Sequence, residues 1–152
     1  MFSSVLGGSF CTSFRLHKPL VYLQKEFSMK LKKVGFFKEL GFRYEQVESI
    51  YEVVRASPDP NEDKIICYLE SGEIFLACAS PSIDVLLKEK RYIGALKILT
   101  DGVWAWSSDL AYYVKEYHIA LNNDFISHMS NNGWVINKDA IDLEGLGSES
   151  IV

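Results

Sequence analysis

LTDGVWAWSSDLAYYV, residues 99–114, holds two tryptophans, two tyrosines, two aspartates and a pair of adjacent serines. Asp101 and Gly102 form a dipeptide that tight hairpin turns favour, and apolar segments of strand length flank it on both sides. The period of two in a strand then places Trp104 and Trp106 on the same face of the second strand. The stretch therefore predicts a β-hairpin that carries both tryptophans on one side.

A helix is expected directly after this hairpin. Ser107 or Ser108 can cap it, and Asp109 in its first turn interacts favourably with the helix dipole. The helical period places Tyr112 away from the apolar stripe, so its side chain is predicted to be exposed. The inner face of this helix is expected to consist of Leu110, Tyr113, Val114 and Tyr117.

Two helices are indicated before the hairpin. Residues 46–56 carry apolar side chains at the spacing of one helix face, namely Val47, Ile50, Tyr51 and Val54. For the second helix, Asp59 suits the N-cap, Glu62 completes a capping box, and Gly72 suits a left-handed C-terminal cap.

Two more helices and three more strands complete the pattern. Residues 80–87 can form a short helix, and a last helix is expected from Asn122 or Asn123 to residue 132. The run 73–80 is expected to be a strand covered on both faces, and short strands are expected at 34–37 and 134–136. The sequence therefore predicts an α+β fold, in which a small, mostly antiparallel sheet packs with four or five helices.

A single domain is expected over residues 29–136. Residues 1–28 are rich in serine, poor in acids and without a clear period, and Met29 opens an ordinary bacterial start. We therefore expect residues 1–28 to be a poorly ordered leader or a mis-assigned start, unless they add a strand around 19–23. Residues 137–152 are acidic and contain glycine and serine, so they are expected to form a frayed tail.

The formal net charge of −4 is unevenly distributed. Residues 1–28 carry an excess of +2, so residues 29–152 carry −6. This charge disfavours binding to phosphates, so no nucleic-acid partner is expected, and it suits a basic protein partner. The three cysteines form no CxxC pair, and no apolar run reaches the roughly 20 residues of a membrane span. A cytoplasmic chain without a membrane partner is predicted.

Motifs for catalysis and for cofactors are absent from the sequence. His17, His118 and His128 have no metal-ligand spacing, and there is no GxSxG, P-loop or GxGxxG motif. We therefore expect no catalytic residue, no bound cofactor and no metal site. Asp101 and Asp109 flank the tryptophans and leave open a cleft for acid–base chemistry, although each also suits a structural role.

The aromatic side chains are the remaining functional candidates, because tryptophan and tyrosine contribute most of the binding energy in many protein interfaces. The outward Tyr112 and whichever tryptophan lies outside the core would serve this purpose by contact. The predicted partner-binding residues are Trp104, Trp106, Asp109 and Tyr112.

Three segments resemble a family of small bacterial proteins. They are MKLKKVGFFKELGF (29–42), NEDKIICYLESGEIFLAC (61–78) and LTDGVWAWSSDLAYYVKEYHIALNNDFISHMSNNGW (99–134), and the last contains the DG-W-W-DLAYYV block. Many members of this family are similar to immunity proteins of polymorphic-toxin systems of the Rhs, wall-associated and contact-dependent type. The chain departs from the pattern at Ser107, where proline is expected, and in its leader.

The resemblance implies an immunity-like protein without catalytic activity. Such a protein binds and neutralises a cognate toxin domain, and many of these toxins are nucleases with basic grooves that an acidic inhibitor can occupy. Two alternatives stay open: a small enzyme or ligand-binding protein with a cleft at the Trp104–Asp109 segment, and a general protein-interaction module. The sequence does not predict the oligomeric state.

Overall fold

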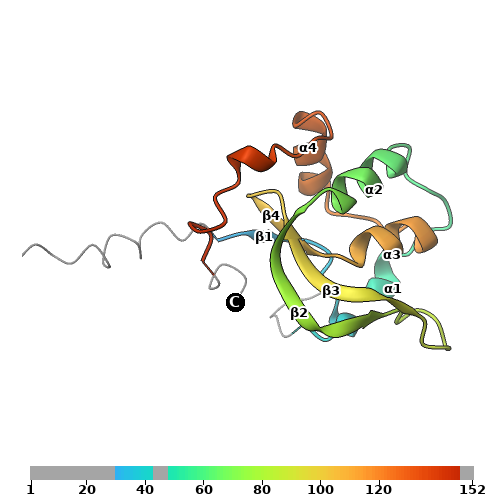
Figure 1. Ribbon diagram of the computed structural model, residues 1–152. Helices are drawn as coiled ribbons and strands as arrows, with labels where there is room; N and C mark the ends of the chain where they lie inside the picture. Colours follow the sequence, from blue (N-terminus) through green and yellow to red (C-terminus); the bar gives the residue numbers. More distant parts are fainter. Residues whose placement is uncertain (1–29, 43–47, 148–152) are drawn as a thin grey trace, which may run out of the picture.

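Four strands form one sheet in the computed structural model, which describes residues 30–42 and 48–147 (Figure 1). Their order across the sheet is β1-β4-β3-β2. β1 runs parallel to β4, and the other neighbours are antiparallel. The strands are β1 (Lys32–Lys33), β2 (Glu73–Ile83), β3 (Tyr92–Thr100) and β4 (Trp104–Ser107).

Helices α2, α3 and α4 pack together over one face of this sheet (Figure 1). The described residues contain the helices α1 (Ile50–Val53), α2 (Glu62–Glu70), α3 (Leu110–Tyr117) and α4 (Asn123–Asn131), and the 3-10 turns η3 (Lys38–Leu40) and η4 (Lys138–Ala140). The predicted α+β class, with a mostly antiparallel sheet and four helices, is therefore confirmed.

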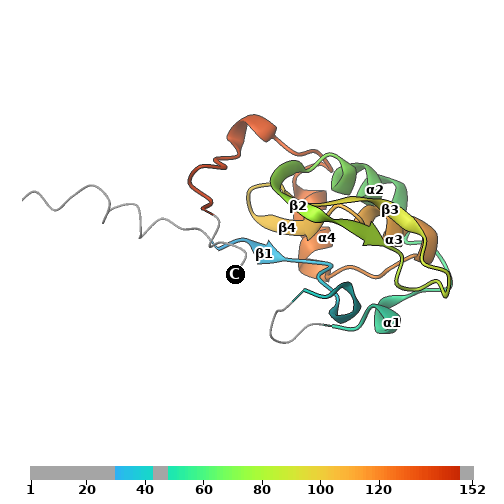
Figure 2. The ribbon, with the colours of Figure 1, turned by 60° about the horizontal axis from the view of Figure 1, so that its bottom comes forward.

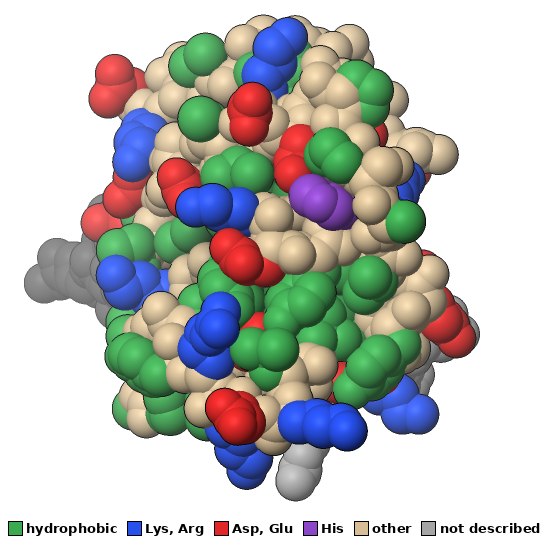
Figure 3. Space-filling model, turned by 90° about the vertical axis from the view of Figure 1, so that its right-hand side faces the viewer, with side chains coloured by type: hydrophobic (Ala, Val, Ile, Leu, Met, Phe, Trp, Pro, Cys, Tyr) green, Lys and Arg blue, Asp and Glu red, His purple; other side chains and the backbone are tan. Residues whose placement is uncertain are grey.

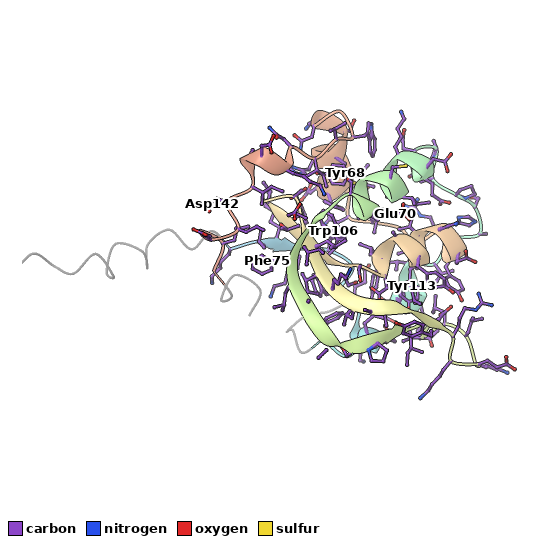
Figure 4. All side chains as sticks on the ribbon, in the orientation of Figure 1. Tyr68, Glu70, Phe75, Trp106, Tyr113 and Asp142 are labelled. Atoms are coloured by element: carbon purple, nitrogen blue, oxygen red, sulfur yellow. The ribbon has the colours of Figure 1, made fainter. Side chains whose placement is uncertain are left out.

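The predicted hairpin is the centre of the fold. β3 and β4 pair with Leu99 opposite Trp106, and Gly102 takes a positive φ of 93° in the turn. Trp106 is fully buried beneath the helices, and its indole Nε1 donates to the carbonyl oxygen of Leu69 in α2 (3.1 Å). Its ring packs against Tyr68 of α2, which lies beside it in Figure 4, and against Phe125 of α4. Tryptophan thus joins the hairpin to two helices through both packing and a hydrogen bond.

The opposite face of the sheet has its own apolar cluster. Its buried members are Leu31, Phe36, Ile98, Ala105 and Leu146. Leu146 lies beyond η4, so the chain after the last helix folds back against the sheet. Residues 137–147 therefore differ from the frayed tail that their composition suggested, because a buried leucine anchors them.

The helix predicted over 46–56 is much shorter in the structure. α1 spans one turn, and residues 46–47 lie outside the described residues. The buried side chains are Ile50 and Val53, whereas Tyr51 is 62% exposed. The chain leaves the helix at Val54, and the backbone N–H of Arg55 donates to the carbonyl of Tyr117 at the end of α3. A tertiary hydrogen bond therefore replaces the predicted helical continuation.

The second predicted helix forms with different caps. Asn61 is the N-cap of α2, and Asp59 accepts a hydrogen bond from the Asn61 backbone N–H instead. The Glu62 carboxylate binds His118 rather than completing a capping box. Ser71 ends the helix in place of a left-handed glycine.

β2 extends through residues 80–83, where a short helix was predicted. The expectation that both faces of this strand are covered is also wrong, because Ile74 and Leu76 are about half exposed. β2 is an edge strand of the sheet, and its pairing with β3 shifts register at three places. Bulges of this kind bend an edge strand. Figure 2 shows the curved β2–β3 hairpin, whose connection lies beside α1.

Several other expectations are settled near the ends of the domain. The strand at the N-terminal edge is Lys32–Lys33 rather than 34–37, and residues 134–136 form no strand. Trp134 instead has a positive φ of 62° just after α4, as part of the turn that ends this helix. Residues 1–28 lie outside the described residues. No helix in the described ranges has the length and apolar character needed to cross a membrane.

Gly72 provides a stability test of the contact between α2 and the hairpin. A Cβ atom at this position would lie 2.6 Å from Trp106 Cζ2 and 2.9 Å from Leu99 Cβ. Gly72→Ala is therefore expected to lower the free energy of unfolding by about 1–3 kcal/mol through overpacking. Urea unfolding followed by tryptophan fluorescence measures this change. Gly94→Ala is the matched control, since nothing lies within 4 Å of its added Cβ, and an equal loss in both variants would contradict the prediction.

Candidate functional site

The carboxylate of Asp101 joins the hairpin turn to two helices. Oδ1 accepts the backbone N–H groups of Val103 (2.9 Å) and Trp104 (2.7 Å). Oδ2 accepts the hydroxyl of Tyr68 in α2 (2.6 Å) and Nε2 of His128 in α4 (2.9 Å). The side chain is only 2% exposed, so these four bonds replace the water that a free carboxylate would bind.

Asp84 has the same arrangement at the opposite end of β3. Its Oδ1 accepts the backbone N–H groups of Leu86 (2.8 Å) and Leu87 (3.3 Å). Its Oδ2 accepts the hydroxyls of Tyr112 (2.8 Å) and Tyr117 (2.6 Å), both from α3. In both aspartates, therefore, one oxygen builds the local turn and the other binds helix side chains. Neither carboxylate has acceptor capacity left for a ligand.

Asp109 is a buried aspartate of a different kind. It is the N-cap of α3 and only 3% exposed. Its Oδ2 accepts the hydroxyl of Ser82 from β2, whereas Oδ1 has no hydrogen-bond partner among the described residues. Buried polar atoms in native proteins are nearly always paired, so the carboxylate of Asp109 differs in this respect from those of Asp84 and Asp101.

Asp109 and Ser82 line a partly open cavity of about 150 Å³. A second carboxylate, Glu39, also lines it and is held by hydrogen bonds from Ser49 Oγ (2.6 Å) and the Ile50 backbone N–H (2.9 Å). The remaining lining residues are the apolar Leu40, Phe42, Pro81, Ile83, Val85 and Leu96. Carboxylates on an otherwise apolar wall are typical of a binding site for a small group.

The four predicted partner-binding residues do not form an exposed platform. Trp104 and Trp106 are 5% and 0% exposed, because the period of two turns both of them toward the helices. Asp109 is buried against Ser82. Tyr112 is half-buried rather than outward, because its hydroxyl reaches back to Asp84. The predicted N-cap is also corrected: the cap is Asp109, and Ser108 Oγ instead accepts the backbone N–H of Lys97.

An exposed apolar area lies elsewhere, where α1 and the end of α3 meet the β2–β3 connection. We call it the tyrosine face, and it consists of the exposed Tyr51 and Val54 and the half-buried Leu86, Tyr112 and Tyr117. Tyr51 donates to the Val85 carbonyl (3.4 Å), and the Tyr112 and Tyr117 rings are 6.4 Å apart. On this side of the molecule, hydrophobic side chains gather among acidic and basic ones (Figure 3).

Sequence patterns could identify only part of these two regions. Aspartate followed by N–H donors two and three residues later is a common turn signal, so Asp84 could have been assigned to a turn. Tyr51 was assigned to the inner face of a longer helix. Ser82 and Glu39 have no local signal, because their roles depend on contacts with distant segments.

The histidines and aspartates are not gathered into one reactive cleft. His118 pairs with Glu62, whereas His128 pairs with Asp101. The cavity at Asp109 contains neither tryptophan and not Asp101. Within the described part of the chain, no group of three or more His, Cys, Asp or Glu side chains could hold a metal ion.

Comparison of the chain with protein-family models, with curated proteins and with solved structures found no match. The functional interpretation therefore depends on the fold and on the side-chain geometry.

The three buried aspartates are expected to respond differently to the same substitution. Asp84→Asn and Asp101→Asn place an amide NH₂ against hydrogen-bond donors, so each should lower the free energy of unfolding by about 2 kcal/mol or more. Asp109→Asn removes a charge that is only half paired, so stability should stay within about 0.5 kcal/mol or rise. Urea unfolding measures all three variants, and equal losses would contradict the assignment of Asp109.

Stability is also expected to fall at both extremes of pH. Burial alone would raise the pKa of Asp84, but bonds from Tyr117, Tyr112 and two N–H groups outweigh it and hold the pKa below its ordinary 3.8. Burial makes the largest contribution to raising the pKa of Tyr117 above its ordinary value, and the neighbouring Asp84 raises it further. The Asp84 contribution is present above about pH 4 and lost on acidification, and the tyrosine contribution is present below about pH 10 and lost above it. Thermal unfolding across pH measures this, and Tyr117→Phe should reduce the alkaline loss.

Proposed function

We propose that this chain is a non-catalytic, immunity-like protein that binds and neutralises a cognate toxin domain. The observation that carries the proposal is the tyrosine face, an exposed apolar area with ordered aromatic side chains. Tyr51 and Val54 are 62% and 42% exposed there. Exposed apolar area of this kind is typical of a protein-interaction site.

The hydroxyl groups of Tyr112 and Tyr117, at the border of the tyrosine face, are held in place before any partner arrives. Asp84 binds both of them, whereas the bond from Tyr51 to the Val85 carbonyl is longer, at 3.4 Å. Little side-chain entropy is therefore lost when a partner packs against these rings, and this loss is a main cost of forming an interface. Tyrosines held in this way suit the centre of an interface.

The charge of the folded domain favours a basic partner. From residue 48 to residue 147 there are sixteen acidic side chains and eight basic ones. An acidic inhibitor and a basic toxin groove attract each other over long distances, which speeds their encounter and selects against acidic partners. The resemblance of residues 29–134 to immunity proteins points to the same class of partner.

Two matched substitutions test this interface. Val54→Lys places a charge in the tyrosine face, whereas Val103→Lys makes the same change in the β3–β4 turn, where the valine is equally exposed at 43%. With the toxin domain encoded beside this gene, the unaltered chain should co-purify and protect cells that co-express the toxin. Val54→Lys should weaken the complex at least tenfold, and Val103→Lys should leave it unchanged.

The outcomes test the proposed function separately from the proposed binding surface. Absence of both complex and protection with the unaltered chain would overturn the proposed function. Equal binding by the two valine variants would show that the toxin contacts a different surface. Thermal unfolding of both variants provides the control for folding.

A further inference from the structure

The cavity at Asp109 is lined by carboxylates, which are not part of the tyrosine face. Two carboxylates, from Glu39 and Asp109, line a space of about 150 Å³, and no basic side chain lies among its described lining residues. The charge is therefore not neutralised from within the cavity. A like-charged ligand would be repelled, so anions are excluded as occupants.

Asp109 is the residue of this wall whose carboxylate the fold leaves only half paired. Two buried side-chain atoms in the described chain have no partner, Asp109 Oδ1 and Ser107 Oγ, and only Asp109 lines the cavity. Asp84 and Asp101, in contrast, accept four hydrogen bonds each. A carboxylate oxygen without a donor is more costly to bury than a hydroxyl, and a positively charged donor compensates it best.

The walls of the cavity select among cations. Calcium and magnesium ions take six or more oxygen ligands, whereas two carboxylates and one hydroxyl are available here. The apolar walls, Leu40 and Leu96 among them, suit an alkyl chain instead. An ammonium group has three donors, and Asp109, Ser82 and Glu39 supply oxygen acceptors among the lining residues.

We propose that this cavity binds a primary alkylammonium group, with the nitrogen at the wall formed by Glu39, Ser82 and Asp109 and the alkyl chain against the apolar walls. The group belongs either to a small free amine or to a lysine side chain of a partner protein. Binding here does not depend on the tyrosine face or on toxin neutralisation.

Titration of the full chain with n-butylammonium, followed by ¹H–¹⁵N NMR, tests the proposal. Saturable shifts are expected in the amides of residues 39–42, 82–85 and 109–111. The expected Kd is in the millimolar range, as suits a ligand of about five heavy atoms. n-Butanol, which is neutral and similar in shape, should bind at least tenfold more weakly. Equal shifts with both compounds, or none with either, would overturn the proposal.

Variants and a second ligand complete the experiment. Asp109→Asn should weaken n-butylammonium binding at least tenfold, and Asp139→Asn, the same charge change at an exposed position, should not. Unchanged binding by Asp109→Asn would overturn the proposal. If Asp109→Asn does not fold, the comparison of n-butylammonium with n-butanol on the unaltered chain decides.

A tripeptide, acetyl-Gly-Lys-Gly-amide, distinguishes the two sources of the ammonium group. Matching shifts from this peptide, lost on acetylation of its lysine, identify a partner's lysine as the occupant. Shifts from n-butylammonium alone identify a free amine. Both results support an ammonium site, and the toxin experiment above stays independent of either.

Discussion

Two buried carboxylates fix the ends of the central strand β3. Asp84 directly follows β2, and its backbone N–H donates to the carbonyl of Arg91 just before β3, whereas Asp101 directly follows β3. Each carboxylate accepts two backbone N–H groups from its own turn and two side-chain donors from helices. Hydrogen bonds to most of the lone pairs of these two carboxylates offset the cost of removing them from water. The positions of α2, α3 and α4 are therefore coupled to the same strand by hydrogen bonds as well as by the apolar core.

The sequence predicts features that depend on neighbouring residues. Asp101, Gly102 and the alternating tryptophans specify the hairpin locally, and Asn122 accepts the backbone N–H of Asp124 as a helix cap. Predictions failed where distant contacts decide the structure. Residues 80–83 have the composition of a helix start, but Ser82 pairs with Asp109, which lies 27 positions later in the chain. Such long-range pairings override local preferences, and one sequence does not reveal them.

Two regions with different properties emerge from this framework. The tyrosine face is exposed, apolar and ordered by a carboxylate whose hydrogen bonds are all used, which suits contact with a protein. The cavity at Asp109 is recessed and has an acceptor that the fold does not use, which suits a small charged group. Asp109 was singled out from the sequence for its place at a helix start, whereas its unpaired oxygen became visible only in three dimensions.

The donors to Asp101 come from segments on both sides of it in the chain. Tyr68 lies 33 positions before Asp101, and His128 lies 27 positions after it. During synthesis, the β3–β4 hairpin and α2 are therefore available before α4 exists, and the carboxylate lacks one of its donors until residue 128 has left the ribosome. Contacts of this separation form late, after their loops have closed. Truncated chains that end before α4 should consequently contain the β3–β4 hairpin but lack the hydrogen bond from His128 to Asp101. Such chains would be natural substrates for chaperones and proteases.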